Sequence, residues 1–269
     1  MLRRFFTTLL AVVVSVLLFV APSQARSLDD IIKEGTIRIG VNPNFPPMSS
    51  YGATNQFEGF DIDIGNQLAE AIGVKAEFVP TETPQRVPFL VSDRIDISLG
   101  ALTRTAARAK LIDFTVPLHT EAMAVLTTDK VSETTWKAFD NSKYTLVNIR
   151  ATWPVDFLKK ELPSAKMLLV DSIADTVRSV AQGRADAIIE NIDFFMAHTK
   201  NFPDVTWKVL PETVFVGYCA IGVSKGNDSL RQFLNIKLYD LHSAGTINDK
   251  WQEWYGAPML KPVVASPYF

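Results

Sequence analysis

The residue types best suited to chemistry lie at the end of one short apolar segment. Residues 95–99 are mainly apolar and β-branched, which predicts a buried strand. Gly100 and Ala101 follow, and their small side chains let backbone groups approach whatever lies beyond the strand. Thr103 then offers a hydroxyl group. Backbone and hydroxyl hydrogen-bonding groups are therefore expected together at this strand end.

A short helix is predicted next, and it brings a cation to the same place. Thr105 can cap a helix over residues 106–111, and Arg108 falls in its first turn. Free backbone N–H groups and the helix dipole already favour an anion there. A guanidinium fixed beside the Thr103 hydroxyl predicts a binding site for a carboxylate group. The alternative is a surface arginine beside an ordinary helix cap.

The chain begins with a sequence typical of a secretory signal peptide. Arg3 and Arg4 precede an apolar run over residues 5–20, and small residues occupy the cleavage positions up to Ala25. The run is short for a membrane-spanning helix, so we expect cleavage after Ala25. The remaining 244 residues hold 25 basic and 29 acidic side chains, a formal charge of −4. This charge gives no reason to expect binding to nucleic acid or anionic lipid.

The numbers and positions of the cysteine and histidine residues argue against disulfides, lipid attachment and metal sites. Cys219 is the only cysteine, so it cannot form an internal disulfide, and no cysteine stands directly after the signal peptide to carry a lipid. The protein is therefore expected to be free in a periplasm. His119, His198 and His242 lack metal-ligand spacing, and no nucleophile elbow or phosphate-binding glycine loop occurs. We expect neither a metal nor a cofactor.

Strands and helices alternate along the chain, which predicts an α/β fold. Two units with a similar order of elements are expected, with no flexible linker between them. In the first unit, Asp61 is expected to cap a helix that ends at Gly73. Strands at 123–127 and 214–223 are expected to connect the units, which permits hinge closure over a cleft. Further strands are expected at 36–41, 76–79, 145–149, 167–170 and 187–189. Further helices are expected at 86–91, at 152–162, through Phe195 and through Trp251, and Ser172 and Asp228 are each expected to cap another helix.

Four segments carry a resemblance to a known family: residues 59–64, 85–90, 103–108 and 112–117. They resemble family 3 solute-binding proteins, the periplasmic polar amino-acid receptors of ABC transporters, and the similarity extends over residues 28–258 in the family's order. The resemblance implies a type II periplasmic-binding fold with two α/β lobes, two crossover strands and a ligand between the lobes. It implies a first lobe of residues 26–121 and 217–269, and a second lobe of residues 122–216. A monomer that delivers its ligand to a membrane permease is the corresponding expectation.

The resemblance also assigns roles to residues of the first lobe. Arg108 matches the family arginine that holds the α-carboxylate of the ligand, and Thr103 matches a hydroxyl residue that bonds the same group. Ala101 matches a position that contributes through its backbone. Phe45 matches an aromatic residue that covers the ligand in many members, although plain core packing is the alternative.

A second group of positions bears on the identity of the ligand. Arg86, with Thr83, resembles a segment of acidic amino-acid receptors in which the arginine faces the side-chain carboxylate. A second buried anion needs a second cation, so the pattern favours glutamate, aspartate or their amides. Asn42 stands where receptors for basic amino acids carry an acid, which argues against a cationic ligand. A solvated surface arginine is the alternative for Arg86.

The second lobe departs from the family pattern in two places. Ala151 and Thr152 resemble the Gly-Thr pair that meets the carboxylate at a helix N-terminus, but Trp153 replaces the hydroxyl residue that follows. Asn191 replaces the aspartate that many members use for the ligand's ammonium group, and an amide accepts a weaker hydrogen bond than a carboxylate does. Either a neighbouring acid, at position 190 or 193, takes its place, or the ligand lacks an α-amino group.

An enzyme on the same scaffold is the alternative function, because a fold alone does not define an activity. Periplasmic cyclohexadienyl dehydratases, which act on prephenate or arogenate, resemble this family and would also use two arginines. Such chemistry needs a positioned general acid, for which Glu190 and Asp193 are the candidates.

Overall fold

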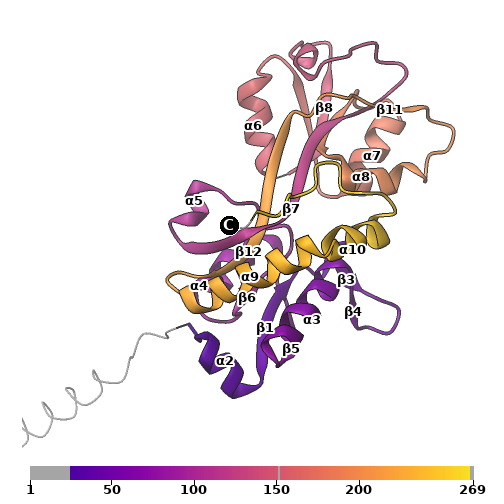
Figure 1. The fold of residues 1–269 in the computed structure, drawn as a ribbon. Helices are drawn as coiled ribbons and strands as arrows, with labels where there is room; N and C mark the ends of the chain where they lie inside the picture. Colours follow the sequence, from indigo (N-terminus) through magenta and orange to yellow (C-terminus); the bar gives the residue numbers. More distant parts are fainter. Residues whose placement is uncertain (1–24, 151, 267–269) are drawn as a thin grey trace, which may run out of the picture.

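The computed structural model describes residues 25–150 and 152–266, and its largest sheet is built around two long antiparallel strands (Figure 1). These are β7 (Ile112–Thr128) and β12 (Phe215–Ser224), which pair from Met123 opposite Phe215 to Ile112 opposite Ser224. The strand order is β10-β7-β12-β6-β1-β5, and β11 also pairs with β7. The remaining strands of this sheet are β1 (Thr36–Val41), β5 (Lys75–Pro80), β6 (Ile97–Ser98), β10 (Ile188–Asn191) and β11 (Trp207–Val209).

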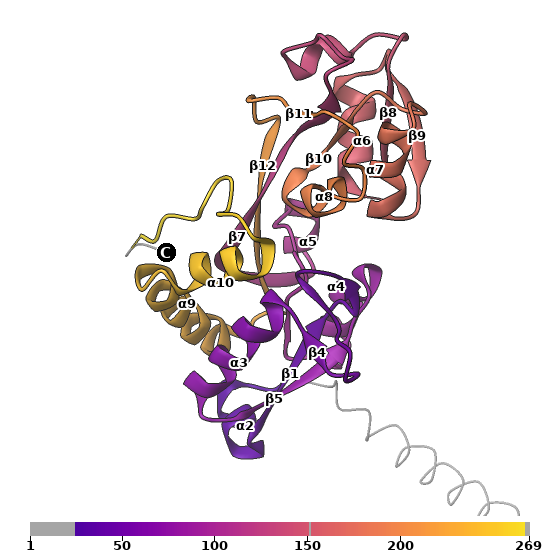
Figure 2. The ribbon, with the colours of Figure 1, turned by 90° about the vertical axis from the view of Figure 1, so that its right-hand side faces the viewer.

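One end of the sheet carries the N-terminal and C-terminal elements (Figures 1 and 2). Here β1 pairs in parallel with both β5 and β6, as expected for strands connected by helices. Helix α3 (Phe60–Ile72) packs on β1 and β5 through an apolar face that includes Ile64 and Leu68. Gly65 permits the close approach, because a Cβ there would lie 2.8 Å from the ring of Phe78. The other helices of this group are α2 (Leu28–Glu34), α4 (Arg86–Val91), α5 (Ala106–Ala109), α9 (Asp228–Ser243) and α10 (Thr246–Tyr255), and a small sheet joins β2 (Asn44–Phe45), β3 (Ser49–Tyr51) and β4 (Phe57–Glu58).

The other end of β7 and β12 carries the middle of the chain (Figure 2). Strands β8 (Thr145–Ile149) and β9 (Lys166–Val170) pair in parallel, and a bridge from Leu146 to Ala187 links β8 to the segment before β10. Ser172 caps the following helix, as predicted, by accepting a hydrogen bond of 3.1 Å from the N–H of Asp175. The helices here are α6 (Trp153–Glu161), α7 (Ile173–Ala181) and α8 (Ile192–Thr199).

Three details of the elements differ from the sequence-based expectation. The N-cap of α3 is Gly59, whereas Asp61 lies inside the helix and accepts a 2.8 Å hydrogen bond from the N–H of Gly100. The prediction of Asp61 as a cap was therefore wrong, because its carboxylate serves a distant strand end instead of its own helix. Asn227 is the N-cap of α9, with Asp228 in the first turn. The strand expected at residues 95–99 is reduced to β6.

The long strand β7 also begins earlier than expected, since it starts at Ile112 and not at Met123. Pro117 lies within it, and proline removes one hydrogen-bond donor from a ladder. The register of β12 shifts opposite this proline, on both sides of Ala220. Such an irregularity lets the two strands remain paired past a residue that cannot donate.

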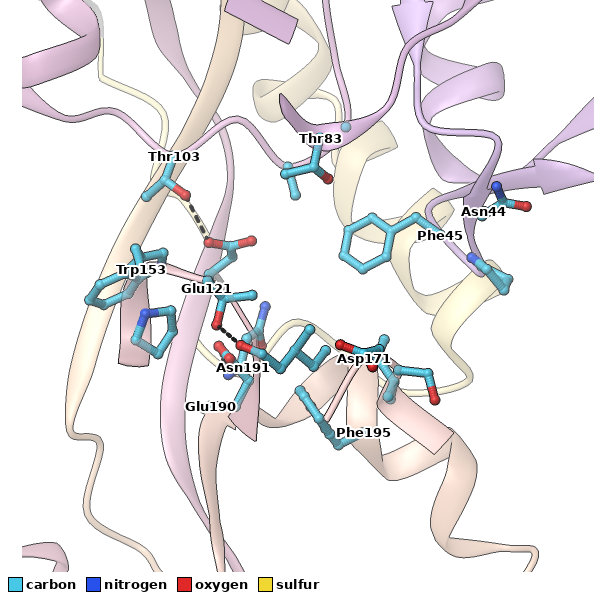
Figure 3. A pocket seen from close by; sticks show the side chains of 18 of the residues that line it. Asn44, Phe45, Thr83, Thr103, Glu121, Trp153, Asp171, Glu190, Asn191 and Phe195 are labelled. Atoms are coloured by element: carbon cyan, nitrogen blue, oxygen red, sulfur yellow. Dashed lines mark hydrogen bonds between the residues drawn. The ribbon is translucent and has the colours of Figure 1, made fainter. Parts of the chain in front are cut away.

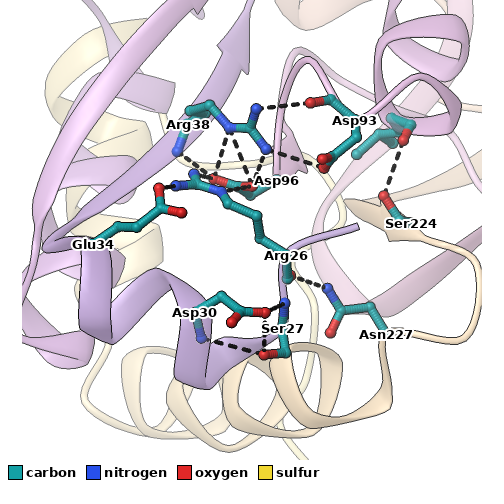
Figure 4. Close-up of polar contacts among 10 residues, drawn as sticks. Arg26, Ser27, Asp30, Glu34, Arg38, Asp93, Asp96, Ser224 and Asn227 are labelled. Carbon is teal, nitrogen blue, oxygen red and sulfur yellow. Dashed lines mark hydrogen bonds and ion pairs between the residues drawn. The ribbon is translucent and has the colours of Figure 1, made fainter. Parts of the chain in front are cut away.

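A buried ionic cluster fixes the first described residues to the sheet (Figure 4). Asp96 is only 3% exposed and accepts a hydrogen bond from the backbone N–H of Arg38 at 2.6 Å. Its carboxylate also binds the guanidinium groups of Arg38, at 2.7 Å, and of Arg26, at 2.9 Å. Glu34 pairs with Arg26 at the exposed side. Two cations offset the cost of burying one carboxylate, so the cluster ties Arg26 to the edge of β1.

The described helices include none that is both long and apolar enough to cross a bilayer. The signal peptide expected over residues 1–25 lies outside the described residues apart from Ala25. Its cleavage stays a prediction.

Candidate ligand-binding cleft

A cavity of about 580 Å³ lies between the two groups of elements, beside the crossing strands (Figure 3). One wall comes from the loop around β2, the start of α4 and the segment from Gly100 to Arg108. The opposite wall comes from the ends of β8 and β9, the starts of α6 and α7, and the segment from Glu190 to His198. The carboxyl ends of neighbouring strands therefore meet helix N-termini across this space, which is where α/β proteins bind ligands.

Eight of the ten residues predicted to bind ligand line this one cavity. They are Phe45, Thr83, Arg86, Ala101, Thr103, Arg108, Thr152 and Asn191. Ala151 lies outside the described residues. Asn42 does not line the cavity: it is 8% exposed, and its Nδ2 donates to Thr83 Oγ1 at 3.2 Å. Asn42 therefore contacts the cavity wall only indirectly, through its hydrogen bond to Thr83.

Two local hydrogen bonds hold Arg108, and the cap by Thr105 is the one that the sequence predicts. Thr105 caps α5 by accepting a hydrogen bond of 3.2 Å from the N–H of Arg108. The guanidinium Nη1 donates to the carbonyl oxygen of Thr103 at 2.7 Å, which limits the motion of the side chain. Ala101 has a left-handed φ of 54°, a strained conformation for a residue with a Cβ. This turn brings the backbone from Gly100 onward along the cavity wall.

Arg86 is the second cation of the cavity and is almost fully buried, with 6% exposure. Its Nε donates to the carbonyl oxygen of Thr83 at 3.2 Å, and its Nη1 donates to the carbonyl oxygen of Gly100. Burial, and next the nearby charge of Arg108, lower its pKa to about 10, so the guanidinium stays charged at neutral pH. Within the described part of the chain, carbonyl groups hold Arg86 and no carboxylate forms an ion pair with it.

Glu121 in β7 also lines the cavity, and it was not among the residues predicted from the sequence. Its Oε2 accepts a hydrogen bond of 3.1 Å from Thr103 Oγ1. Gly217 lies opposite it in β12 and leaves room for both side chains, because a Cβ there would lie 3.1 Å from Thr103 Cγ2. Burial raises the pKa of Glu121. A single acid within a mainly apolar stretch, residues 116–126, was the signal that could have identified it.

The two acids on either side of Asn191, Glu190 and Asp193, differ in whether they reach the cavity. Glu190 lines the cavity, and its Oε1 accepts a 3.1 Å hydrogen bond from the N–H of Asn191. Burial raises the pKa of Glu190 to about 8. Asp193 does not line the cavity, and burial raises its pKa to about 6. Of the two acids that could replace the missing aspartate, only Glu190 therefore reaches the cleft.

The side-chain oxygen of Asn191 is used within its own chain segment, at the N-terminus of α8. Oδ1 accepts a hydrogen bond of 3.3 Å from the N–H of Asp193 and so caps α8. The side chain is 4% exposed, and Nδ2 has no hydrogen-bond partner among the described residues. A buried donor of this kind is costly unless a ligand supplies an acceptor.

Trp153 forms part of the second wall and rests on a crossing strand. Its ring centroid lies 4.9 Å from that of Phe215 in β12 and 5.9 Å from that of Phe157 in α6. Both pairs are edge-to-face, a favourable arrangement for aromatic rings. The wall of the cavity is thus in direct contact with the segment that joins the two groups of elements.

Comparisons with known proteins agree with this geometry. The family described as "Bacterial extracellular solute-binding proteins, family 3" matches residues 37–257. The chain is 26% identical over 235 residues to the L-cystine-binding protein TcyJ of Escherichia coli (strain K12), covering 87% of this chain and 88% of that protein. It is 20% identical over 234 residues to the cyclohexadienyl dehydratase of Pseudomonas aeruginosa, covering 86% and 87%.

Among solved structures, the ancestral amino acid-binding protein AncCDT-1, a precursor of cyclohexadienyl dehydratase, superposes with a TM-score of 0.73. That similarity has 27% identity and covers 85% of this chain and 98% of the other. The predicted two-lobe type II periplasmic-binding fold, with β7 and β12 as its crossover strands, is therefore confirmed. The chain belongs to the family 3 bacterial extracellular solute-binding proteins.

Proposed function

We propose that the protein is the periplasmic receptor of an ABC importer and binds an amino acid in the cleft between its lobes. The observation that carries this proposal is the pair of guanidinium groups, Arg86 and Arg108, in one cavity. Each is held by backbone carbonyl groups, so each keeps its charge available for an anion. Relatives that are named for binding amino acids support the same class of ligand.

We propose further that the ligand is glutamate, aspartate or one of their amides. Arg108 and Thr103 would receive the α-carboxylate, and Arg86 beside Thr83 would receive the side-chain carboxylate or amide oxygen. Two cations on separate elements suit a ligand with two oxygen-rich ends. A carboxylate without an α-amino group is the alternative ligand, since Asn191 is not an acid.

Ligand binding is proposed to close the cleft by hinge motion between two lobes, residues 26–121 with 217–269 and residues 122–216. Two adjacent strands, β7 and β12, connect the lobes, so bending of this pair would change the width of the cavity. The closed monomer would then dock on a membrane permease. Closure driven by ligand requires that the ligand bind the closed form more tightly than the open form.

A thermal-shift screen of the mature protein, residues 26–269, tests the proposal. The protein is first partly unfolded and dialysed to remove any bound ligand. The panel holds the common L-amino acids, L-cystine, succinate, 2-oxoglutarate and prephenate, because any ligand that prefers the folded state raises the melting temperature. Glutamate, aspartate or an amide should give the largest shift, and calorimetry should give a micromolar dissociation constant, about −8 kcal/mol. No shift with any amino acid would refute the amino-acid receptor.

A dehydratase is the second candidate function, and Glu190 is the observation in its favour. A carboxyl group with a pKa of about 8 is protonated at neutral pH and can act as a general acid in the cleft. The sequence similarity to a cyclohexadienyl dehydratase supports the same idea. Purified protein should then convert prephenate to phenylpyruvate, which absorbs in the ultraviolet. Absence of turnover above the uncatalysed rate would remove this candidate.

A further inference from the structure

The hydroxyl group of Thr103 already has an acceptor inside the cleft. It donates to Glu121 Oε2 at 3.1 Å, and both residues line the cavity (Figure 3). A threonine hydroxyl carries a single hydrogen, so it donates to one acceptor at a time. Under the proposed function, the ligand carboxylate at Thr103 and Arg108 is a second acceptor for that hydrogen. An ionised Glu121 and a bound carboxylate therefore compete for one donor.

The packing around Glu121 keeps its carboxyl group beside Thr103. Gly217 stands opposite Glu121 in β12, and a Cβ there would lie 3.6 Å from Glu121 Oε2 and 3.1 Å from Thr103 Cγ2. Thr103 is only 7% exposed, its backbone forms a bridge with Cys219, and its carbonyl oxygen accepts from Arg108. The two side chains are thus held in contact from both strands. What can change between them is which one donates the hydrogen bond.

The electrostatic surroundings of Glu121 allow it to change its protonation state. Burial is the largest influence and raises its pKa, whereas the hydrogen bonds from Cys219 and Thr103 lower it. The charged and titratable groups that interact with it come from both sides of the cleft: Arg86 of α4, Arg108 of α5, Glu190 of β10, Cys219 of β12 and Tyr255 of α10. A ligand carboxylate at Thr103 adds a negative charge beside Glu121, which favours its protonated form.

Resting on the proposed function, we propose that Glu121 is a switch for the carboxylate subsite, which it blocks when ionised and completes when protonated. Ionised Glu121 accepts the hydrogen of Thr103, so the subsite lacks this donor. Protonated Glu121 donates to Thr103 Oγ1 instead, and the Thr103 hydrogen is then free to bond the ligand carboxylate. One proton passes from the solvent to Glu121 as the ligand binds, so the affinity falls as the pH rises.

Glu121→Gln tests the switch, because a glutamine amide donates to Thr103 as a protonated carboxyl group does and does not ionise. The probe is L-glutamate, or whichever amino acid of the thermal-shift panel binds the wild-type protein most tightly, and calorimetry gives its affinity at pH 5.5 and pH 8.5. The wild-type affinity should fall roughly tenfold or more over this range. The variant should bind at both pH values within about fivefold of the wild type at pH 5.5.

Asp171→Asn is the matched control for this comparison. Asp171 lines the same cavity, but its side chain is 82% exposed and pairs with Arg150. This variant should keep the pH dependence of the wild type. Glu190 and His198 also line the cavity and are common to all three proteins, so the difference between wild type and Glu121→Gln isolates Glu121.

Proton exchange provides a second measurement. Binding enthalpies at pH 7.5, in buffers of different ionisation enthalpy, should show that the wild type takes up more protons per bound probe than Glu121→Gln. Equal proton uptake, or binding by Glu121→Gln more than about fivefold weaker than the wild type at pH 5.5, would overturn the switch and leave the amino-acid receptor intact. A wild-type affinity that is constant or rises from pH 5.5 to pH 8.5 would overturn it without any variant. If no amino acid of the panel binds the wild type at either pH, the proposed function fails first and this inference fails with it.

Discussion

At the scale of single residues, the surroundings of Arg108 and Arg104 differ although only three residues separate them in sequence. Arg108 lines the cleft and donates to the carbonyl oxygen of Thr103. Arg104 is exposed and lies outside the cleft, with its backbone N–H bonded to Tyr218. The pair therefore provides a matched test of which guanidinium the ligand needs.

We expect Arg108→Ala to weaken ligand binding at least 100-fold, measured by calorimetry with the best amino acid from the screen. Closure would bury the ligand carboxylate without a cation, at a cost of roughly 3 to 5 kcal/mol. Arg104→Ala should leave the affinity within about twofold of the wild type. Similar losses in both variants would instead indicate a general effect on this segment.

The pKa of Glu190 predicts how the stability of the ligand-free protein depends on pH. Burial raises this pKa from 4.5 to about 8, so the folded protein binds more protons than the unfolded chain between these values. Stability is therefore lost as pH rises through this interval. The polar and charged groups that act on Glu190 are Glu121 from β7, Asn148 from β8 and the backbone of Asn191.

Glu190→Gln should remove this pH-dependent loss. Between pH 5 and pH 9, the free energy of unfolding of the wild type should fall by about 1 to 3 kcal/mol more than that of the variant. Urea denaturation at the two pH values measures the difference, and other acids with raised pKa values are common to both proteins and cancel. An identical pH dependence in both proteins would mean that Glu190 is not the titrating group.

Some site residues could be predicted from the sequence, and others could not. Arg108 and Thr105 are close in sequence, so their hydrogen bond follows from the local pattern. Glu121 stands out locally as an acid among mainly apolar residues, but its contact with Thr103 depends on the pairing of β7 with β12, which places Gly217 opposite Glu121. The position of Asn42 behind Thr83 likewise depends on how two loops pack.

At the scale of the elements, strong local patterns predicted the boundaries well. Strands 36–41 and 145–149 have the predicted bounds, because each is rich in β-branched residues and is followed by a polar residue. The start of β7 was missed because Pro117 reads as a strand end, and only the irregular register of β12 lets the strand continue. The cap of α3 was missed because Asp61 bonds to Gly100, which is distant in sequence.

The ionic cluster around Asp96 predicts a large effect on stability. We expect Asp96→Asn to lower the free energy of unfolding by about 2 to 4 kcal/mol, because Arg26 and Arg38 would lose their shared buried partner. Urea denaturation of the mature protein measures this loss. Glu34→Gln is the control: its side chain is 55% exposed and pairs with Arg26 alone, so the change should be below about 1 kcal/mol. Equal effects would mean that burial of Asp96 is not decisive.

At the scale of the whole molecule, the contact between Trp153 and Phe215 links the cleft wall to the crossing strands. Hinge closure should change this aromatic contact, so saturating ligand should alter tryptophan fluorescence while small-angle scattering shows a smaller radius of gyration. Trp153→Phe should remove most of the fluorescence change. Trp207→Phe, in β11 and away from the cleft, should retain it. An unchanged radius of gyration at saturation would refute closure.

The pairing of β7 with β12 would allow the chain to be shortened between these two strands. Met123 and Phe215 face each other across the two strands, and everything between them forms one continuous stretch of sequence. Replacing that stretch by a two-residue type I′ turn such as Asn-Gly would convert the strands into a simple hairpin. The resulting miniature would keep both guanidinium groups and Glu121 but no opposing wall, and it would display half of a binding site as an open surface.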